Sequence, residues 1–239
     1  MTIQRLAVAR LSAFSLSIGE PRCYRRRVME PESAPSEEQI DAAESAQSAP
    51  DVCVHDPMPP AAPQNLFLFA CAFEGGLVVV AAGLGWLLKQ ALWADLHWNV
   101  CDALAGILAS LPLVAMFMVT LRSSVRPLCE IRNFLEANIA PIFGRWSLAQ
   151  LAVVSLLAGV GEEVLFRAVI QGWLGEHLGL GWGLVAASVL FGCAHPLTRA
   201  YAVAAGLVGL YLGLLWRAGG NLLIPIVAHG AYDFLALVY

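Results

Sequence analysis

Apolar residues fill six long runs between Leu66 and the C-terminus, and short polar connections separate these runs. The runs cover residues 66–88, 103–121, 148–166, 180–197, 200–216 and 222–238. A helix needs about 20 predominantly apolar residues to cross the hydrocarbon core of a bilayer. The shorter runs would therefore be tilted or packed inside a bundle. The pattern predicts an all-α, multi-pass transmembrane helical bundle of about six spans.

The amino-acid composition supports a chain that is embedded in a lipid membrane. Hydrophobic residues make up 59% of the sequence and charged residues only 13%, whereas a soluble domain carries about 25% charge. The net charge of −4 argues against a nucleic-acid partner, which would require a basic surface. The six cysteines are scattered without a C-x-x-C pair, so neither a disulfide framework nor a zinc ribbon is expected.

The N-terminal 64 residues differ from the rest. Residues 30–64 contain eight acidic residues, seven prolines and no Lys or Arg. Such a segment cannot bury enough apolar surface to offset the cost of ordering it, so residues 1–64 are predicted to be a disordered tail. Residues 1–29 hold six arginines. This leaves open a basic cytoplasmic tail, a translation start at Met29 or an organelle targeting segment.

Basic residues predict the orientation of the bundle. Arg122, Arg126, Arg132, Arg145 and Arg199 fall in connections on one side, against Lys89 and Arg217 on the other. The positive-inside rule places the first set and both termini in the cytoplasm. Residues 65–147 would then form two membrane helices and a cytoplasmic connection. We expect a bacterial cell membrane, with an organelle membrane as the alternative.

The later runs retain six ionisable residues: Glu162, Glu163, Arg167, His195, His229 and Asp233. Ionisable groups at membrane depth are costly and indicate function. Glu163 and Arg167 are four residues apart, so they share a helix face and can pair. Glu162 is rotated by about 100° from Glu163 and is left as a candidate general base. A purely structural ion pair is the alternative for Glu163 and Arg167.

The two histidines are weaker indicators when each is taken alone. His195 follows Phe191 by four residues and ends an apolar run, where a histidine often only caps a helix. His229 and Asp233 share a helix face, which a local hydrogen bond would also explain. Pro225 predicts a kink one turn before His229, because proline cannot donate a backbone hydrogen bond.

Two other residues are given structural interpretations. Glu74 lies in the first apolar run beside Gly75 and Gly76, where a neighbouring helix could approach closely. Cys193 is interpreted as a small packing residue, and the motif faces offer no serine. A covalent nucleophile is therefore not expected.

The motifs EExxxR from Glu162, FxxxH from Phe191 and HxxxD from His229 occur in this order, each on a predicted membrane helix. Together they resemble the CPBP family, over residues 148–239. This family comprises the type II CAAX prenyl endopeptidases and bacterial proteins linked to bacteriocin processing and immunity, with lysostaphin-resistance-like members. The resemblance implies that residues 148–239 are a catalytic membrane domain, and that the chain is an intramembrane endopeptidase.

The resemblance also implies roles for the motif residues. Glu162 would activate a water that His195 helps to hold, and His229 with residue 233 would stabilise the oxyanion of the tetrahedral intermediate. The prenyl endopeptidases carry Asn at the position of Asp233, and an ionised Asp donates no hydrogen bond. Asp233 is therefore either protonated or orients His229.

For the other pair, the resemblance implies that Arg167 fixes Glu163 and the helix geometry. It favours a reaction without cofactor or metal. Zinc held by Glu162, His195 and His229 is the alternative, because two histidines and a carboxylate can form a catalytic zinc site.

The expected partners are the bilayer and a membrane-associated peptide or protein substrate, prenylated or not; the oligomeric state is open. A catalytically silent scaffold or immunity protein is a second interpretation. A proton-coupled carrier is a third, although the sequence shows no internal repeat to support it.

Overall fold

The computed structural model describes residues 64–239, and the predictions made for residues 1–63 lie outside this part. Every regular element in the described part is helical, which confirms the all-α prediction. The α-helices are α3 (Gln64–Leu88), α4 (Val100–Arg122), α5 (Arg126–Phe134), α6 (Ala140–Phe143), α7 (Leu148–Glu163), α8 (Gly172–Leu178), α9 (Leu180–Ala194), α10 (Arg199–Gly219) and α11 (Leu223–Val238). Two π-helical segments are η1 (Leu135–Ile139) and η2 (Val164–Gln171).

Three helices of the described part, α3, α4 and α10, are long and apolar enough to cross a membrane. Helices α9 and α11 are apolar but have only 15 and 16 residues. The predicted count of six spans is therefore not confirmed. Large apolar side chains lie exposed on the long helices, among them Val79 and Trp86 of α3 and Leu108 of α4. Exposed apolar faces of this kind suit contact with lipid tails.

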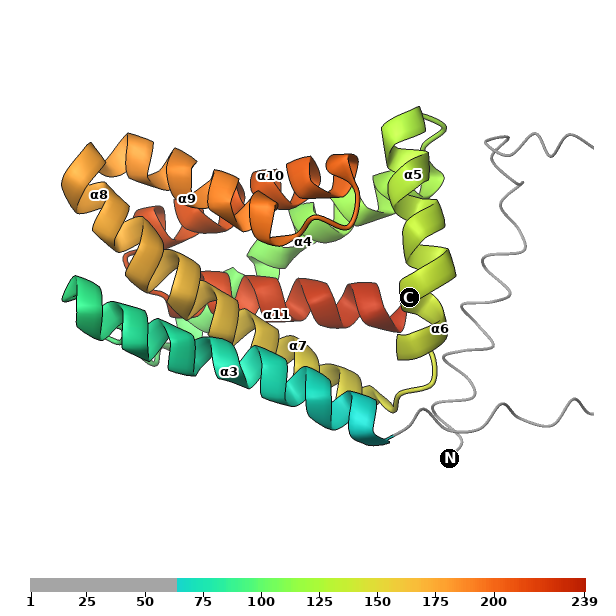
Figure 1. The fold of residues 1–239 in the computed structure, drawn as a ribbon, viewed down its shortest axis with the longest axis horizontal. Helices are drawn as coiled ribbons and strands as arrows, with labels where there is room; N and C mark the ends of the chain where they lie inside the picture. Colours follow the sequence, from blue (N-terminus) through green and yellow to red (C-terminus); the bar gives the residue numbers. More distant parts are fainter. Residues whose placement is uncertain (1–63) are drawn as a thin grey trace, which may run out of the picture. The chain divides into compact units, whose positions relative to one another are not determined.

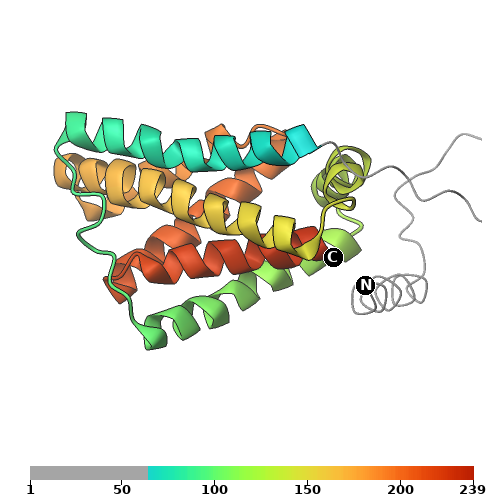
Figure 2. The same ribbon diagram turned by 90° about the horizontal axis from the view of Figure 1, so that it is seen from below.

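The helices form two layers. Helices α3, α7, α11 and α4 lie side by side in this order (Figure 2), and each packs against its neighbour. Helices α9 and α10 pair in a second layer, which lies above α11 in Figure 1. Helix α5 stands across one end of the bundle against α4 and α10. The short α9 and the central α11 thus belong to different layers that meet around α7 and η2.

Glycines let α7 approach both of its neighbours closely. A Cβ atom on Gly159 would lie 2.8 Å from the Ile226 carbonyl oxygen and 3.0 Å from the Gly230 nitrogen, both on α11. A Cβ atom on Gly161 would meet the Glu74 carbonyl oxygen of α3 at 2.5 Å. Only glycine permits backbones to approach this closely. The helical turn before Glu162 is therefore packed closely between α3 and α11.

Helix α7 starts at a capping box and continues without a break into η2 and α8. The Ser147 side chain accepts from the backbone N–H of Gln150, and the Gln150 side chain accepts from the Ser147 N–H. Val164 and Gly172, at the two junctions, both keep right-handed helical backbone angles. The π-helical segment begins directly after Glu163, and segments of this kind are frequent at functional sites.

Asn221 fixes the start of α11. Its Oδ1 accepts from the backbone N–H groups of His97 at 3.1 Å and Leu223 at 3.0 Å. Its Nδ2 donates to the His97 carbonyl oxygen at 2.7 Å and to Asp102 Oδ2 at 2.8 Å. One buried amide therefore ties the connection between α3 and α4 to the first turn of the helix that carries His229.

The prediction of a helix kink at Pro225 is wrong. Helix α11 begins at Leu223, so Pro225 lies in its first turn, where a backbone N–H has no partner within the helix. The missing donor costs no hydrogen bond there. The helix runs on through His229 to Val238.

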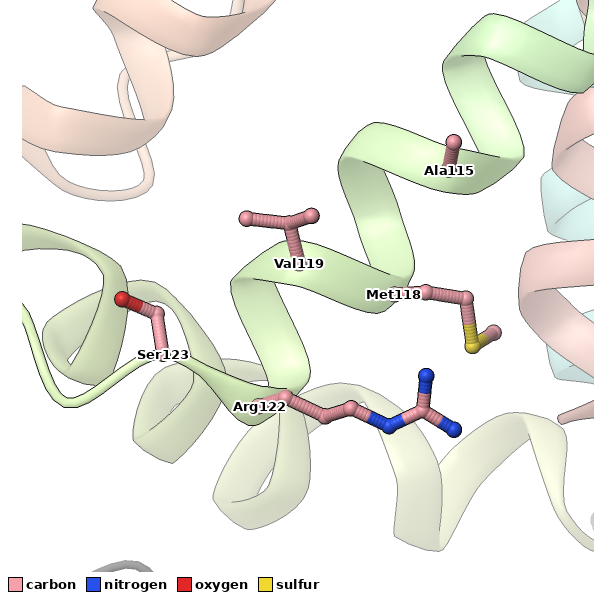
Figure 3. Close-up of a pocket in the computed structure, with 5 residues that line it drawn as sticks. All are labelled: Ala115, Met118, Val119, Arg122 and Ser123. Atoms are coloured by element: carbon pink, nitrogen blue, oxygen red, sulfur yellow. The ribbon is translucent and has the colours of Figure 1, made fainter.

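A shallow pocket of about 450 Å³ lies at the C-terminal end of α4 and is lined by Ala115, Met118, Val119, Arg122 and Ser123. Figure 3 shows the Arg122 and Met118 side chains extending to the same side of the helix. The lining contains none of the motif residues, so the pocket is separate from the site considered below.

We expect Gly159→Ala to destabilise the bundle by about 1–3 kcal/mol, because the new methyl group meets backbone atoms of α11 that cannot rotate away. Gly83→Ala is the matched control: the same substitution on α3 meets no atom within 4 Å. Thermal unfolding in detergent measures both. Equal melting temperatures for the two variants would contradict the close packing of α7 on α11.

Candidate active site

The three motifs converge on one place in the bundle. Glu162 and Glu163 end α7, Arg167 lies in η2, His195 caps the C-terminus of α9, and His229 and Asp233 lie on α11. The six residues divide into two groups. Glu163, Arg167 and His229 are buried and lie in contact with one another. The second group is Glu162, which is also buried, with His195 and Asp233, whose side chains keep 25% and 28% of their surface exposed.

The buried group is one ionic network. Arg167 Nε donates to Glu163 Oε2 at 2.8 Å, and Arg167 Nη2 donates to Glu163 Oε1 at 3.3 Å. The predicted pair is therefore present, and both side chains are fully buried. His229 Nδ1 lies 3.0 Å from Glu163 Oε1, so Glu163 joins η2 to α11 as well. The sequence indicated Glu163–Arg167 as a pair, and the structure extends it to three residues.

Phe191 holds the network and the second histidine in place. Its ring lies 5.0 Å from the Arg167 guanidinium carbon and stacks on the His195 ring at a centroid distance of 4.6 Å. The edge of the same ring faces His229 at 6.1 Å. Gly209 of α10 gives the ring room, because a Cβ there would lie 3.1 Å from Phe191 Cβ. The first residue of the FxxxH motif is thus a packing centre for the other motifs.

Two members of the second group, Glu162 and His195, have the geometry of an acid–base pair. His195 Nδ1 lies 2.8 Å from the Phe191 carbonyl oxygen, and because a carbonyl only accepts, Nδ1 carries the hydrogen in this contact. The other nitrogen, Nε2, then faces Glu162 Oε2 at 3.6 Å, too far for a direct hydrogen bond. Glu162 Oε2 has no hydrogen-bond partner within residues 64–239. This oxygen and His195 Nε2 are thus free to bind a shared third group, such as water.

On the other side of the site, His229 Nε2 lies 3.4 Å from Asp233 Oδ2. His229 therefore has a carboxylate oxygen at each ring nitrogen, Glu163 at Nδ1 and Asp233 at Nε2. Two flanking acceptors fix the plane of the imidazole. This geometry supports the second of the two roles considered for Asp233, the orientation of His229.

The motifs did not indicate two residues that lie beside the site. The Glu74 carboxylate of α3, interpreted above as structural, is within electrostatic range of Glu162 and Asp233. The Tyr201 phenol, near the start of α10, is likewise within range of Glu162 and Asp233. Glu74 carried a signal in the sequence, as an acid in an apolar run. Tyr201 carried none, because a tyrosine near the start of an apolar run is ordinary.

Zinc is the alternative to a reaction without a metal, and its ligands would have to converge on one point. No group of three or more metal-ligating side chains that could hold a metal ion occurs in the part of the chain that the structure describes. His229, one of the three candidate ligands, has Glu163 Oε1 3.0 Å from its Nδ1, and its Nε2 lies 3.4 Å from Asp233 Oδ2.

Arg167→Met is expected to lower the free energy of unfolding by about 3–5 kcal/mol, because it leaves the buried Glu163 carboxylate without its cation. Adding Glu163→Gln should recover part of the loss. The matched control is Arg126→Met, which breaks the exposed Arg126–Glu130 pair and should change little. Chemical unfolding in detergent measures all three. A single Arg167→Met variant as stable as the control would contradict a stabilising network.

Comparisons with known proteins agree with this geometry. Residues 144–235 match the family described as type II CAAX prenyl endopeptidase, Rce1-like. An uncharacterised protein of Bacillus subtilis, YpbD, is 33% identical over 95 residues, which cover 38% of this chain and 46% of that protein. The chain thus aligns with about half the length of this relative, and no solved structure matches it. The resemblance carried by the three motifs is therefore confirmed: residues 144–235 are similar to the Rce1-like type II CAAX prenyl endopeptidases.

Proposed function

We propose that this protein is an integral-membrane endopeptidase in which Glu162 activates a water molecule for attack on a peptide bond. One observation carries the proposal. Glu162 is a buried carboxylate whose Oε2 has no hydrogen-bond partner among the described residues, and this oxygen faces the partly exposed His195 at 3.6 Å. A merely structural pair needs Glu163 and Arg167, and gives no reason for a second acid at this position.

The first step follows from these positions. A water bonded to Glu162 Oε2 and His195 Nε2 attacks the carbonyl carbon, and its proton passes to Glu162 as the new C–O bond forms. The carbonyl oxygen becomes an oxyanion. An N–H of His229, oriented by Glu163 and Asp233, donates a hydrogen bond to it. Donors fixed in advance need no reorganisation as the charge develops.

The second step breaks the C–N bond. The tetrahedral intermediate collapses, the oxyanion returns to a carbonyl, and the leaving nitrogen takes the proton that Glu162 holds. The products are a new carboxyl terminus and a new amino terminus, and Glu162 is again a carboxylate. No covalent enzyme intermediate is required.

The family match and the apolar helices support a substrate associated with the membrane. We propose a membrane-associated peptide or protein, with a prenylated CAAX sequence as the first class to test because of the family to which residues 144–235 are similar. The distribution of basic residues supports an orientation with both termini in the cytoplasm, and we propose a bacterial cell membrane as the location. Arg122 and Arg199 would then lie on the cytoplasmic side.

The decisive variant is Glu162→Gln, which keeps the size of the side chain but cannot accept a proton from water. Wild type and variant are reconstituted in liposomes with a prenylated CAAX peptide and solubilised membrane proteins, and mass spectrometry detects new peptide termini. We expect wild-type cleavage and a loss in the variant of at least about 10²-fold. Glu130→Gln, the same change in an exposed ion pair, is the matched control and should cleave normally.

The same assay separates the alternatives. Cleavage that survives a chelator supports the metal-free reaction, and cleavage lost with the chelator indicates zinc. Full activity of Glu162→Gln contradicts the proposed base. If folded wild type produces no new termini, the scaffold or immunity interpretation is favoured over the enzyme.

A further inference from the structure

The site lacks one donor that its chemistry requires. An oxyanion is best stabilised by more than one hydrogen bond, and the related prenyl endopeptidases have an Asn amide where this chain has Asp233. An ionised carboxylate accepts hydrogen bonds and repels an oxyanion. Because Asp233 Oδ2 lies 3.4 Å from His229 Nε2, it is placed to orient that ring. A neutral donor from outside the three motifs would complete the site.

Tyr201 is a neutral donor beside these groups. It is the third residue of α10, and its backbone N–H donates to the Thr198 side chain, which caps the helix, at 3.0 Å. The residue is half-buried and packs against the core cluster that contains Phe191 and Phe166. Its ring centroid lies 6.4 Å from that of His195. Packing and capping thus hold the ring on the edge of the site.

The Tyr201 side chain lies beside the reacting groups, next to His195. Its phenol interacts electrostatically with both Glu162 and Asp233. Within residues 64–239 the hydrogen bonds of Tyr201 are limited to its backbone, so the hydroxyl is not committed to a structural bond. A phenol is protonated at neutral pH and donates one hydrogen bond. Tyr211, on the same helix, differs because its hydroxyl donates to the Ala109 carbonyl oxygen at 2.9 Å.

We propose that the Tyr201 hydroxyl donates a hydrogen bond to the oxyanion formed during peptide hydrolysis, beside the N–H of His229. This role rests on the proposed function. Because the phenol is neutral, it stabilises the developing charge without adding a cation to the buried network. In this chain the Tyr201 hydroxyl thus replaces the hydrogen-bond donor that the Asn amide supplies at the position of Asp233 in the related endopeptidases.

The test compares Tyr201→Phe with Tyr211→Phe, the same loss of one hydroxyl group on the same helix. In proteoliposomes, Tyr201→Phe should lower kcat on the order of 10²-fold with little change in KM, because the hydrogen bond forms mainly in the transition state. Tyr211→Phe should leave kcat unchanged and lower the melting temperature, since it loses a bond between α10 and α4.

A second measurement applies even where Tyr201→Phe folds poorly. Wild-type sequence carrying 3-fluorotyrosine at position 201 is titrated with a phosphinic peptide, whose anionic oxygens imitate the oxyanion. We expect the fluorine resonance to shift with the phosphinic peptide and not with the corresponding uncharged peptide. An unchanged resonance would overturn the role.

The kinetic outcomes separate the two proposals. Wild-type kcat in folded Tyr201→Phe, or a raised KM with unchanged kcat, overturns the role of Tyr201 and leaves Glu162 as the base. A wild-type protein without turnover overturns the proposed function, and the role of Tyr201 in it. Loss of kcat in Tyr201→Phe but not in Tyr211→Phe, with both folded, supports the donor.

Discussion

The buried ion pair between Glu163 and Arg167 is the interaction on which the site depends. Both side chains are inaccessible, and the strongest contact between them is 2.8 Å. Neither charge is tolerable there without the other, because desolvation of an unpaired ion costs several kcal/mol. By also bonding His229, Glu163 fixes the ring that faces the accessible side. The pair therefore sets the geometry of a site whose reacting members, Glu162 and His195, are held less tightly.

The buried network and the group formed by Glu162, His195 and Asp233 have different roles in the site. The ring of Phe191 packs against the Arg167 guanidinium, and Gly159 and Gly161 allow the neighbouring helices to pack closely against α7. This packing limits rearrangement of the network. Glu162, His195 and Asp233 have fewer bonds to the protein. Preorganised catalysis requires reacting groups that a rigid surrounding structure holds in position. The buried network provides this support for Glu162, His195 and Asp233.

Helix length also shapes the site. Helix α9 has 15 residues and stops at His195, which places an imidazole at a helix end rather than on a helix face. The π-helical segment that follows Glu163 interrupts the regular α-helical hydrogen bonding inside the bundle. Every residue from Val164 to Val169 is buried there. Interruptions of this kind are tolerated inside a membrane protein where neighbouring helices surround the backbone. The deviations from regular long helices occur where the motif residues meet.

The sequence by itself determined the helical class, the apolar segments close to their observed limits, the pairing of Glu163 with Arg167 and the family of residues 144–235. These features depend on local periodicity and on short spacings, which the order of residues states directly. The tertiary structure decided the rest. It joined His229 to Glu163, placed Glu74 and Tyr201 beside Glu162, and put Pro225 in a first turn rather than at a kink. Those outcomes depend on which helix faces meet across the bundle, and close packing of distant segments has no local signature in the chain.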